Sequence, residues 1–345
     1  MNVWKRKLLC FFCCLLVLFL ISLLVCLTNA DVAIRVYQKT GMTDGNPNKT
    51  SEDSGITTIA EDVVCHYGIL YDDTYPNGFL DIYRDTTGIQ HPVYVFVHGG
   101  GYAWGDKRTG DPLGEGAKEL DGQTELFVEL VRHGYTVVSV NYALVPDYRY
   151  PVPFLQLNNA FRFLSEHQDD WQLDMDAVIL SGSSAGGHLA GQYAAAVSND
   201  SYARQLDIVP NLSTASLRAL VLRCALLEPE NFDKVDTLLF KMMFHALKEG
   251  YFGHDQRILT EVNVTEHISS DFPPTYLTDG NHGTFDNQAK HAAAILSAKG
   301  VLNEFFYTPI ETAQLEHGYD MDLANPFAEE NLRRELVFID AVLAA

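Results

Sequence analysis

Short apolar runs alternate with longer amphipathic segments along most of this chain. Residues 93–97, Val-Tyr-Val-Phe-Val, are apolar without interruption, which is typical of a strand in a sheet covered on both faces. Residues 117–133 instead repeat their apolar side chains, among them Phe127 and Val131, at helical spacing on one side. The two patterns predict a buried strand followed by an amphipathic helix.

The same alternation continues to the C-terminus. Further strands are expected at residues 62–70, 78–83, 136–141, 178–181, 219–224, 275–278 and 304–308. Further helices are expected at residues 151–167, 188–197, 288–299 and 326–344. Strands and helices that follow one another in this way predict an α/β fold, with a mostly parallel sheet and helices on both faces.

One stretch interrupts the alternation. Residues 228–271 have a helical pattern where the sheet needs only a connection, so we expect a small cap insertion within a domain over 62–345. An apolar run in it, Leu-Leu-Phe at 238–240 with Met242, Met243 and Phe244, lines an acyl pocket or forms the buried face of a helix.

The N-terminal part has a different character. Residues 8–27 are apolar except for Ser22 and follow the basic residues 5–7, so they are long enough to cross a bilayer. We expect residues 1–30 to be an uncleaved membrane anchor, with a cleaved signal segment as the alternative. Either one places the bulk of the protein outside the cytoplasm. The polar residues 31–61 are expected to be a linker and an arm over the domain.

The net charge and the cysteine content argue against several classes of protein. The formal net charge is −21, which argues against nucleic acid as a partner, because phosphate and acidic side chains repel each other. Four of the six cysteines lie in the apolar N-terminal run. The remaining two, Cys65 and Cys224, do not form a disulfide framework or a zinc-binding spacing, and we expect them to be buried thiols.

Candidate chemistry begins with Gly-x-Ser-x-Gly at residues 182–186, directly after a predicted strand and before an alanine-rich helix. A serine on such a sharp turn has an exposed hydroxyl, and the flanking glycines allow strand and helix to approach closely. The helix N-terminus also presents backbone N–H groups to a developing oxyanion. Ser184 is therefore the candidate nucleophile.

A second motif, His98-Gly99-Gly100-Gly101, follows the apolar strand 93–97. Glycine inside regular structure is destabilising by about 0.5–1 kcal/mol relative to alanine, so three in a row do not serve the stability of a sheet. They do allow backbone N–H groups to approach a ligand. We expect the N–H groups of Gly100, Gly101 and Ala185 to form an oxyanion hole.

The two motifs together resemble the α/β-hydrolase family, in particular its carboxylesterase/lipase branch of hormone-sensitive-lipase-like and feruloyl-esterase-like enzymes. Residues 104–107, 141–142 and 150–153 agree with this resemblance, which extends from about residue 62 to the C-terminus. It implies an α/β-hydrolase fold, a small-molecule acyl ester as substrate, and no need for a metal or an organic cofactor.

The resemblance also implies a general base and an acid. His317, in His-Gly-Tyr after the last predicted strand, falls where the family has its base. An imidazole, with an ordinary pKa of about 6.5, can accept the serine proton and later protonate the leaving group. Weaker rivals for this role are His188, His282 and His291.

Two aspartates compete for the role of the acid. The feruloyl-esterase-like pattern His-Gly-x-x-Asp matches residues 282–286 and favours Asp286, whose other role would be to cap the following helix. The hormone-sensitive-lipase pattern falls on Gly283, which has no carboxylate. Asp279, at the end of the predicted strand, is the alternative.

These residues predict a serine hydrolase that cleaves carboxylic esters through an acyl-enzyme on Ser184. A serine peptidase or an arylformamidase on the same fold is an alternative, because the triad does not distinguish an acyl oxygen from an acyl nitrogen. A catalytically inactive hydrolase fold that serves as an extracellular binding module is the second alternative.

Overall fold

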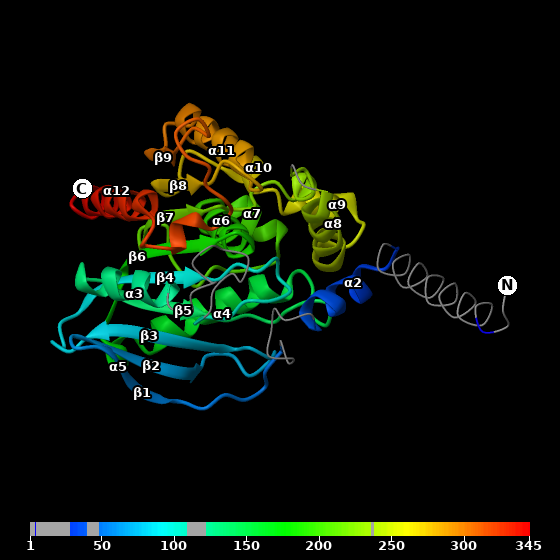
Figure 1. Cartoon of the computed structure of the whole chain (residues 1–345). Helices are drawn as coiled ribbons and strands as arrows, with labels where there is room; N and C mark the ends of the chain where they lie inside the picture. Colours follow the sequence, from blue (N-terminus) through cyan, green and yellow to red (C-terminus); the bar gives the residue numbers. More distant parts are fainter. Residues whose placement is uncertain (1–3, 5–27, 40–47, 109–121, 236–237) are drawn as a thin grey trace.

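The computed structural model describes residues 4, 28–39, 48–108, 122–235 and 238–345, and its centre is one twisted nine-stranded sheet (Figure 1). The strands are β1 (Gly55–Ala60), β2 (Val63–Leu70), β3 (Phe79–Asp85), β4 (His91–Val97), β5 (Thr136–Val140), β6 (Leu173–Ser183), β7 (Leu217–Arg223), β8 (Thr275–Asp279) and β9 (Asn303–Tyr307). Their spatial order is β1-β2-β3-β5-β4-β6-β7-β8-β9.

Helices and short 3₁₀ turns connect these strands. They are α2 (Ala30–Tyr37), α3 (Gly122–Arg132), α4 (Val152–Glu166), α5 (Gln168–Trp171), α6 (Ala185–Ser198), α7 (Asp200–Gln205), η3 (Pro229–Asn231), α8 (Leu238–Phe252), α9 (Gln256–Glu261), α10 (Val264–His267), α11 (Asp286–Ala298), η4 (Tyr319–Met321) and α12 (Pro326–Leu343). The predicted helix at 117–133 corresponds to α3, and its residues 117–121 lie outside the described part of the chain.

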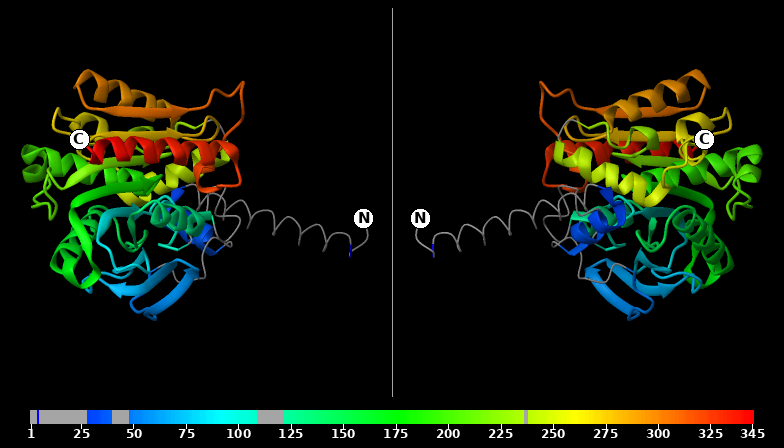
Figure 2. Two further views of the ribbon diagram at one scale, coloured as in Figure 1. Left: turned by 90° about the vertical axis from the view of Figure 1, so that its left-hand side faces the viewer. Right: turned by 90° about the vertical axis from the view of Figure 1, so that its right-hand side faces the viewer.

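The sheet has two parts. Strands β1, β2, β3 and β5 pair antiparallel, whereas β5, β4, β6, β7, β8 and β9 pair parallel in that order. Parallel strands end at the same edge, so the residues that follow β4, β6, β8 and β9 are brought together. The predicted α/β fold with a mostly parallel sheet is confirmed, and helices cover both faces (Figure 2).

The apolar strand β4 shows why both faces are covered. Its side chains point alternately to opposite faces. Val93, Val95 and Val97 belong to the core beneath α4 and α6, and Tyr94 and Phe96 belong to the core beneath α3 and α12. The apolar residues 93–97 of β4 therefore lie at the centre of a three-layer structure.

The N-terminal region differs from the expected linker, because residues 31–61 contribute a helix and a strand. Helix α2 packs against α8, and its Ile34 is completely buried. The residues of β1 extend the antiparallel part of the sheet. The predicted anchor at 8–27 lies outside the described residues, and within the described residues no helix has the length and apolarity to cross a membrane.

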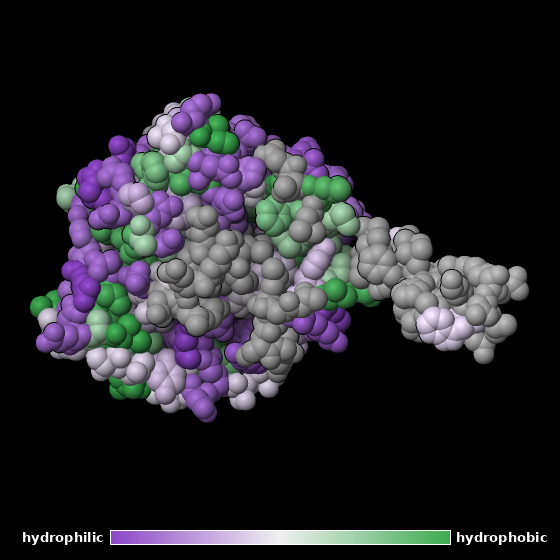
Figure 3. Space-filling view, viewed as in Figure 1, coloured by the Kyte–Doolittle hydropathy of each residue, from purple (hydrophilic) through white to green (hydrophobic). Residues whose placement is uncertain are grey.

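Between β7 and β8 the chain forms η3, α8, α9 and α10, within the stretch 228–271 that was expected to be a cap. The apolar run at the start of α8 is divided, because Met243 and Phe244 are buried whereas Leu238 is 73% exposed. Apolar surface is visible on the side of the molecule where α2 and α8 meet (Figure 3). The two remaining cysteines, Cys65 and Cys224, are buried free thiols, as expected.

Candidate active site

Ser184 lies at the junction of β6 and α6 in a backbone conformation that non-glycine residues seldom adopt. Its φ is 54° and its ψ is −116°. Such a conformation persists only where the surroundings enforce it. Here the Ser184 N–H donates to the carbonyl of Arg223 (2.9 Å), and the Ser184 carbonyl accepts from the N–H of His188 (3.1 Å) and of Leu226 (3.2 Å). The nucleophile elbow predicted from the motif is thus held by neighbouring backbone.

The two motif glycines are required by close backbone contacts. A Cβ on Gly182 would lie 2.2 Å from the carbonyl oxygen of Gly186. A Cβ on Gly186 would lie 2.1 Å from the carbonyl oxygen of Val97 and 2.3 Å from that of His98. Both distances are far below van der Waals contact, so only glycine fits at either position.

Helix α6 places its N-terminus directly after Ser184. The helix begins at Ala185, and every residue from Ala185 to Val197 is buried. A helix that is buried on all sides belongs to the middle of a domain. Ser184 itself is only 4% exposed, so a substrate must reach it beneath the segments that cover the sheet edge.

The glycine turn after β4 has a similarly constrained backbone. Gly100 has φ +96°, and a Cβ there would lie 2.1 Å from the carbonyl oxygen of Trp104. Gly101 has φ +58°, and its Cβ would lie 2.5 Å from Leu247 Cδ1 on α8. The turn therefore packs directly against the helix that covers it.

Tyr142 supports this turn, and sequence reasoning did not assign it a role. Its ring stacks on that of His98, with centroids 4.3 Å apart. Its hydroxyl donates to the carbonyl oxygens of His98 (2.9 Å) and Gly99 (3.2 Å). The imidazole Nδ1 of His98 lies 2.8 Å from the Gly99 carbonyl oxygen. The only signal in the sequence was the Asn-Tyr pair at 141–142 that follows β5.

His317, the predicted base, lies in the loop between β9 and η4 and is nearly buried. Its Nδ1 is 3.1 Å from the hydroxyl oxygen of Thr284. The ring of Phe285 meets the imidazole edge-on, with centroids 5.4 Å apart. The loop after β8 thus contacts the base through two consecutive residues.

The two candidate acids have different surroundings. Asp279, at the end of β8, is fully buried and accepts a hydrogen bond from the hydroxyl of Thr284. Asp286 lies in the first turn of α11, and its carboxylate binds Lys290 Nζ at 2.6 Å. Thr284 therefore connects Asp279 with His317, whereas the favoured candidate Asp286 is paired with a lysine on its own helix.

Burial raises the pKa of Asp279 to about 7, because a charged carboxylate loses its hydration there. The nearby charge of Asp286 acts in the same direction. The hydrogen bond from Thr284 and the proximity of His317 oppose this rise, since both favour the ionised form.

The three rival histidines have structural surroundings. His188 is fully buried and donates from Nε2 to the carbonyl of Val262 (2.8 Å), and burial lowers its pKa to about 4. His291 Nδ1 lies 2.6 Å from a carboxylate oxygen of Glu228 at the surface. The backbone of His282 forms a bridge with Glu316, beside the predicted base.

The loops that carry Ser184 and His317 share one support, the C-terminal end of β7. The Arg223 carbonyl binds the Ser184 N–H, and its guanidinium binds Asp320 (2.7 Å) just after the base. The adjacent Cys224 Sγ accepts from the Gly318 N–H at 3.3 Å. Because Glu335 on α12 also binds Arg223, this buried ion cluster fixes both loops to the same strand end.

An aromatic cluster lies beside the base. Phe285 contacts Phe244 on α8 (5.5 Å between centroids) and Phe232 (5.8 Å), and Phe244 stacks on Phe240. Phe285 is the member of this cluster that meets His317, and Phe244 of α8 contacts Phe285.

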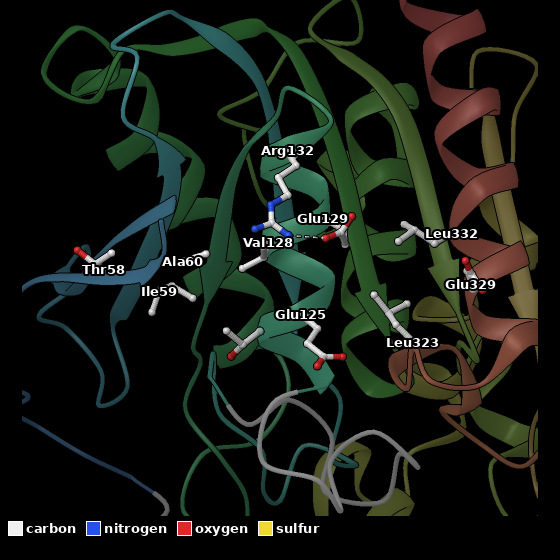
Figure 4. Close-up of a pocket in the computed structure, with 11 residues that line it drawn as sticks. Thr58, Ile59, Ala60, Glu125, Val128, Glu129, Arg132, Leu323, Glu329 and Leu332 are labelled. Atoms are coloured by element: carbon white, nitrogen blue, oxygen red, sulfur yellow. Dashed lines mark hydrogen bonds and ion pairs between the residues drawn. The ribbon is translucent and has the colours of Figure 1, made fainter. Parts of the chain in front are cut away.

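A separate groove of about 800 Å³ lies between α3, α12 and β1. In Figure 4, Glu125, Glu129 and Arg132 extend from α3, with Arg132 paired to Glu129, and Glu329 and Leu332 lie on α12. Its lining comes from the face of the sheet opposite to α6, so it is distinct from the Ser184 site.

The parallel sheet, the serine elbow at the end of β6 and the glycine turn after β4 define an α/β-hydrolase. Residues 80–296 match the BD-FAE family, and the chain belongs to it, as the two motifs predicted. The fold is similar to that of an inhibited esterase B from Lactobacillus rhamnosis, with a TM-score of 0.70 and 22% identity over 83% of this chain and 89% of that one.

Two curated proteins from Mycobacterium tuberculosis are similar to this chain in sequence. Esterase LipC is 27% identical over 155 residues, which are 44% of this chain and 34% of that protein. The probable carboxylic ester hydrolase LipM is 25% identical over 293 residues, which are 80% of this chain and 61% of that protein. The chain therefore spans between a third and three fifths of the length of these relatives.

Proposed function

We propose that this protein is a serine hydrolase that cleaves carboxylic esters of small molecules. The observation that carries the proposal is the strained backbone of Ser184 at the end of β6, next to loops that hold a glycine turn and a buried histidine. Strain of this kind at a solvent-shielded hydroxyl has no evident benefit for stability. The esterase names of LipC, LipM and esterase B are consistent with it.

In the proposed reaction His317 Nε2 accepts the hydroxyl proton of Ser184 while Oγ attacks the ester carbonyl. The tetrahedral intermediate collapses to an acyl-enzyme, and the Nε2–H protonates the departing alcohol. Water then attacks the acyl carbon with the same imidazole as base, which releases the acid and restores Ser184. Asp279 is our choice for the acid, because it is buried and joined to His317 through Thr284.

The proposed oxyanion hole consists of the N–H groups of Gly100, Gly101 and Ala185. The constrained φ angles of the two glycines and the start of α6 at Ala185 support this assignment. Donors held rigidly before the reaction need no reorganisation when charge develops on the carbonyl oxygen. The contacts of Tyr142 and Leu247 with the turn would keep these donors in place.

We propose that the acyl group of the ester substrate is apolar. The aromatic cluster of Phe285, Phe244 and Phe240 extends from His317 and makes this side of the imidazole apolar. We therefore propose esters with an aliphatic or aromatic acyl group as the substrate class.

A fluorophosphonate probe tests the proposal on the full-length chain. We expect labelling of the wild type and loss of labelling in Ser184→Ala, together with loss of p-nitrophenyl ester hydrolysis by at least about 10⁴-fold. A folded wild type that is not labelled would instead favour the binding module. Faster cleavage of p-nitroanilides than of matched esters would favour a peptidase.

We further propose that residues 8–27 anchor the protein in a membrane, with the catalytic domain outside the cytoplasm. The proposal rests on the length of the apolar run and the preceding basic residues 5–7. Extraction of membranes with alkaline carbonate tests it. The full-length chain should stay in the membrane fraction, and its release into the supernatant would contradict the proposal.

A further inference from the structure

We propose that Thr284 is a positioning residue whose hydroxyl links Asp279 to His317 and thereby selects the catalytically competent tautomer of the imidazole. The inference rests on the proposed function, since a tautomer matters only if His317 acts as a base. It differs from the expectation that a carboxylate contacts the base directly.

The geometry places Thr284 between the two groups. Its Oγ1 donates to Asp279 Oδ1 and lies 3.1 Å from His317 Nδ1, and all three residues are buried. The surrounding loops are joined by Asn281, whose amide binds the carbonyl oxygens of Thr308 (2.8 Å) and Ala313 (2.7 Å). The bridge is therefore held between two connected loops.

The number of protons determines the direction of each hydrogen bond. A hydroxyl has one proton to donate, and an ionised carboxylate can only accept. The proton of Thr284 consequently points to Asp279, so that Oγ1 must accept a proton from His317 Nδ1. An imidazole with its proton on Nδ1 has its lone pair on Nε2, which is the tautomer that can deprotonate Ser184.

Protonation of Asp279 removes this constraint. The neutral carboxyl group can donate to Oγ1, which frees the threonine proton for Nδ1 and moves the imidazole proton to Nε2. That tautomer cannot accept a proton from serine. Activity should therefore increase as Asp279 loses its proton, near pH 7.

Several other groups face Asp279 and contribute to its titration. They are His317, Asp286 at the start of α11, Cys224 after β7, and Tyr319 on η4. Asp320 Oδ1 lies 3.7 Å from Cys224 Sγ, and the charges of Asp279 and Asp320 both raise the pKa of the Cys224 thiol. Because Asp286 is paired with Lys290, its charge is partly compensated where it faces Asp279.

The test compares Thr284→Val, which removes the hydroxyl at constant shape, with Thr284→Ser, which keeps it. Thr275→Val is the matched control, since Thr275 is also buried, at the start of β8, but donates to the carbonyl of Pro273 (2.8 Å). The readouts are kcat and KM for a p-nitrophenyl ester from pH 5 to 9, and the imidazole signals of full-length protein labelled with ¹⁵N-histidine.

We expect Thr284→Val to lower kcat about 10- to 100-fold with little change in KM, as for the loss of a hydrogen bond to a charged partner. Its pH profile should shift and the Nδ1–H signal of His317 should weaken. Thr284→Ser should stay within about threefold of the wild type, because it restores the hydroxyl. Thr275→Val should change neither the profile nor the signal.

The proposal is overturned if folded Thr284→Val keeps the wild-type kcat and pH profile. If that variant does not fold, Thr284→Ser decides, because a profile unlike that of the wild type would contradict a role of the hydroxyl alone. Fluorophosphonate labelling separates this result from the proposed function. A labelled wild type with an unimportant Thr284 refutes only the bridge, whereas an unlabelled wild type refutes the hydrolase itself.

Discussion

The nucleophile side and the acid–base side of the site are built in different ways. The elbow is one continuous motif, and its two glycines meet backbone atoms at distances that exclude any side chain. The acid–base side combines the ends of two strands with Thr284, Asn281 and the ion cluster around Arg223. A short motif determines backbone shape, whereas a set of converging loops determines which side chains meet.

This difference explains why the sequence motif pointed to a single candidate nucleophile, Ser184, but left two aspartates as candidates for the acid. The pattern at 282–286 favoured Asp286, whose carboxylate binds Lys290 four residues later on the same helix. Asp279 lies at the strand end and reaches His317 by way of a hydroxyl that no pattern indicated.

The largest expected effect is on kcat/KM, and it distinguishes Asp279 from Asp286 as the acid. Asp279→Asn should lower kcat/KM about 10³- to 10⁴-fold, because an amide can also donate and no longer enforces the required tautomer. Asp286→Asn should cost less than about threefold, as expected for a partly exposed ion pair on a helix. Ester hydrolysis by both variants at pH 8 measures the difference, and the reverse order of losses would restore Asp286 as the acid.

On the nucleophile side, Gly186→Ala should destabilise the fold by about 3–5 kcal/mol, because its Cβ would lie 2.1 Å from the carbonyl oxygen of Val97. Gly191→Ala on the same helix is the control, since its Cβ would lie 3.1 Å from a methyl group of Val264. Urea denaturation gives both unfolding free energies. Equal losses would contradict the close approach at the elbow.

Ionisation of Asp279 should lower the free energy of unfolding of the protein. Because burial raises the pKa of Asp279 to about 7, ionisation opposes folding, and stability present below about pH 4 is lost as the pH rises through 7. Asp279→Asn has no such ionisation, so its stability relative to the wild type should increase from pH 4 to 8 by on the order of 2–4 kcal/mol. Calorimetry at both pH values measures this, and a constant difference would argue against a buried ionised group.

The smallest effect concerns the support of the glycine turn. Tyr142→Phe removes the hydroxyl that binds the carbonyls of His98 and Gly99 but keeps the ring stack, and should lower kcat about 5- to 10-fold. Phe154→Leu, a change in a buried side chain of α4, serves as a stability control. A rise in KM with kcat unchanged would instead indicate that Tyr142 contributes to substrate binding.

The local sequence pattern was enough to predict the central strand and the sharp turn at Ser184. The uninterrupted apolar run at 93–97 predicted a strand that is buried on both faces of the sheet. The glycines around Ser184 predicted a close approach of backbone segments, because a Cβ does not fit there. Both features can be recognised from neighbouring residues in the sequence. Helix α2 and strand β1 were not visible in this way, because their contacts are with distant elements, α2 packing on α8 and β1 pairing with β2.

Only the tertiary structure decided how Asp279, Thr284 and His317 meet and that Tyr142 supports the glycine turn. These contacts join residues that lie far apart in the chain or across a loop whose path depends on its neighbours. Their distances are set by the order of the parallel strands and by the loops at their ends. No short sequence pattern contains that information, because hydrogen bonds between loops depend on where the whole sheet places them.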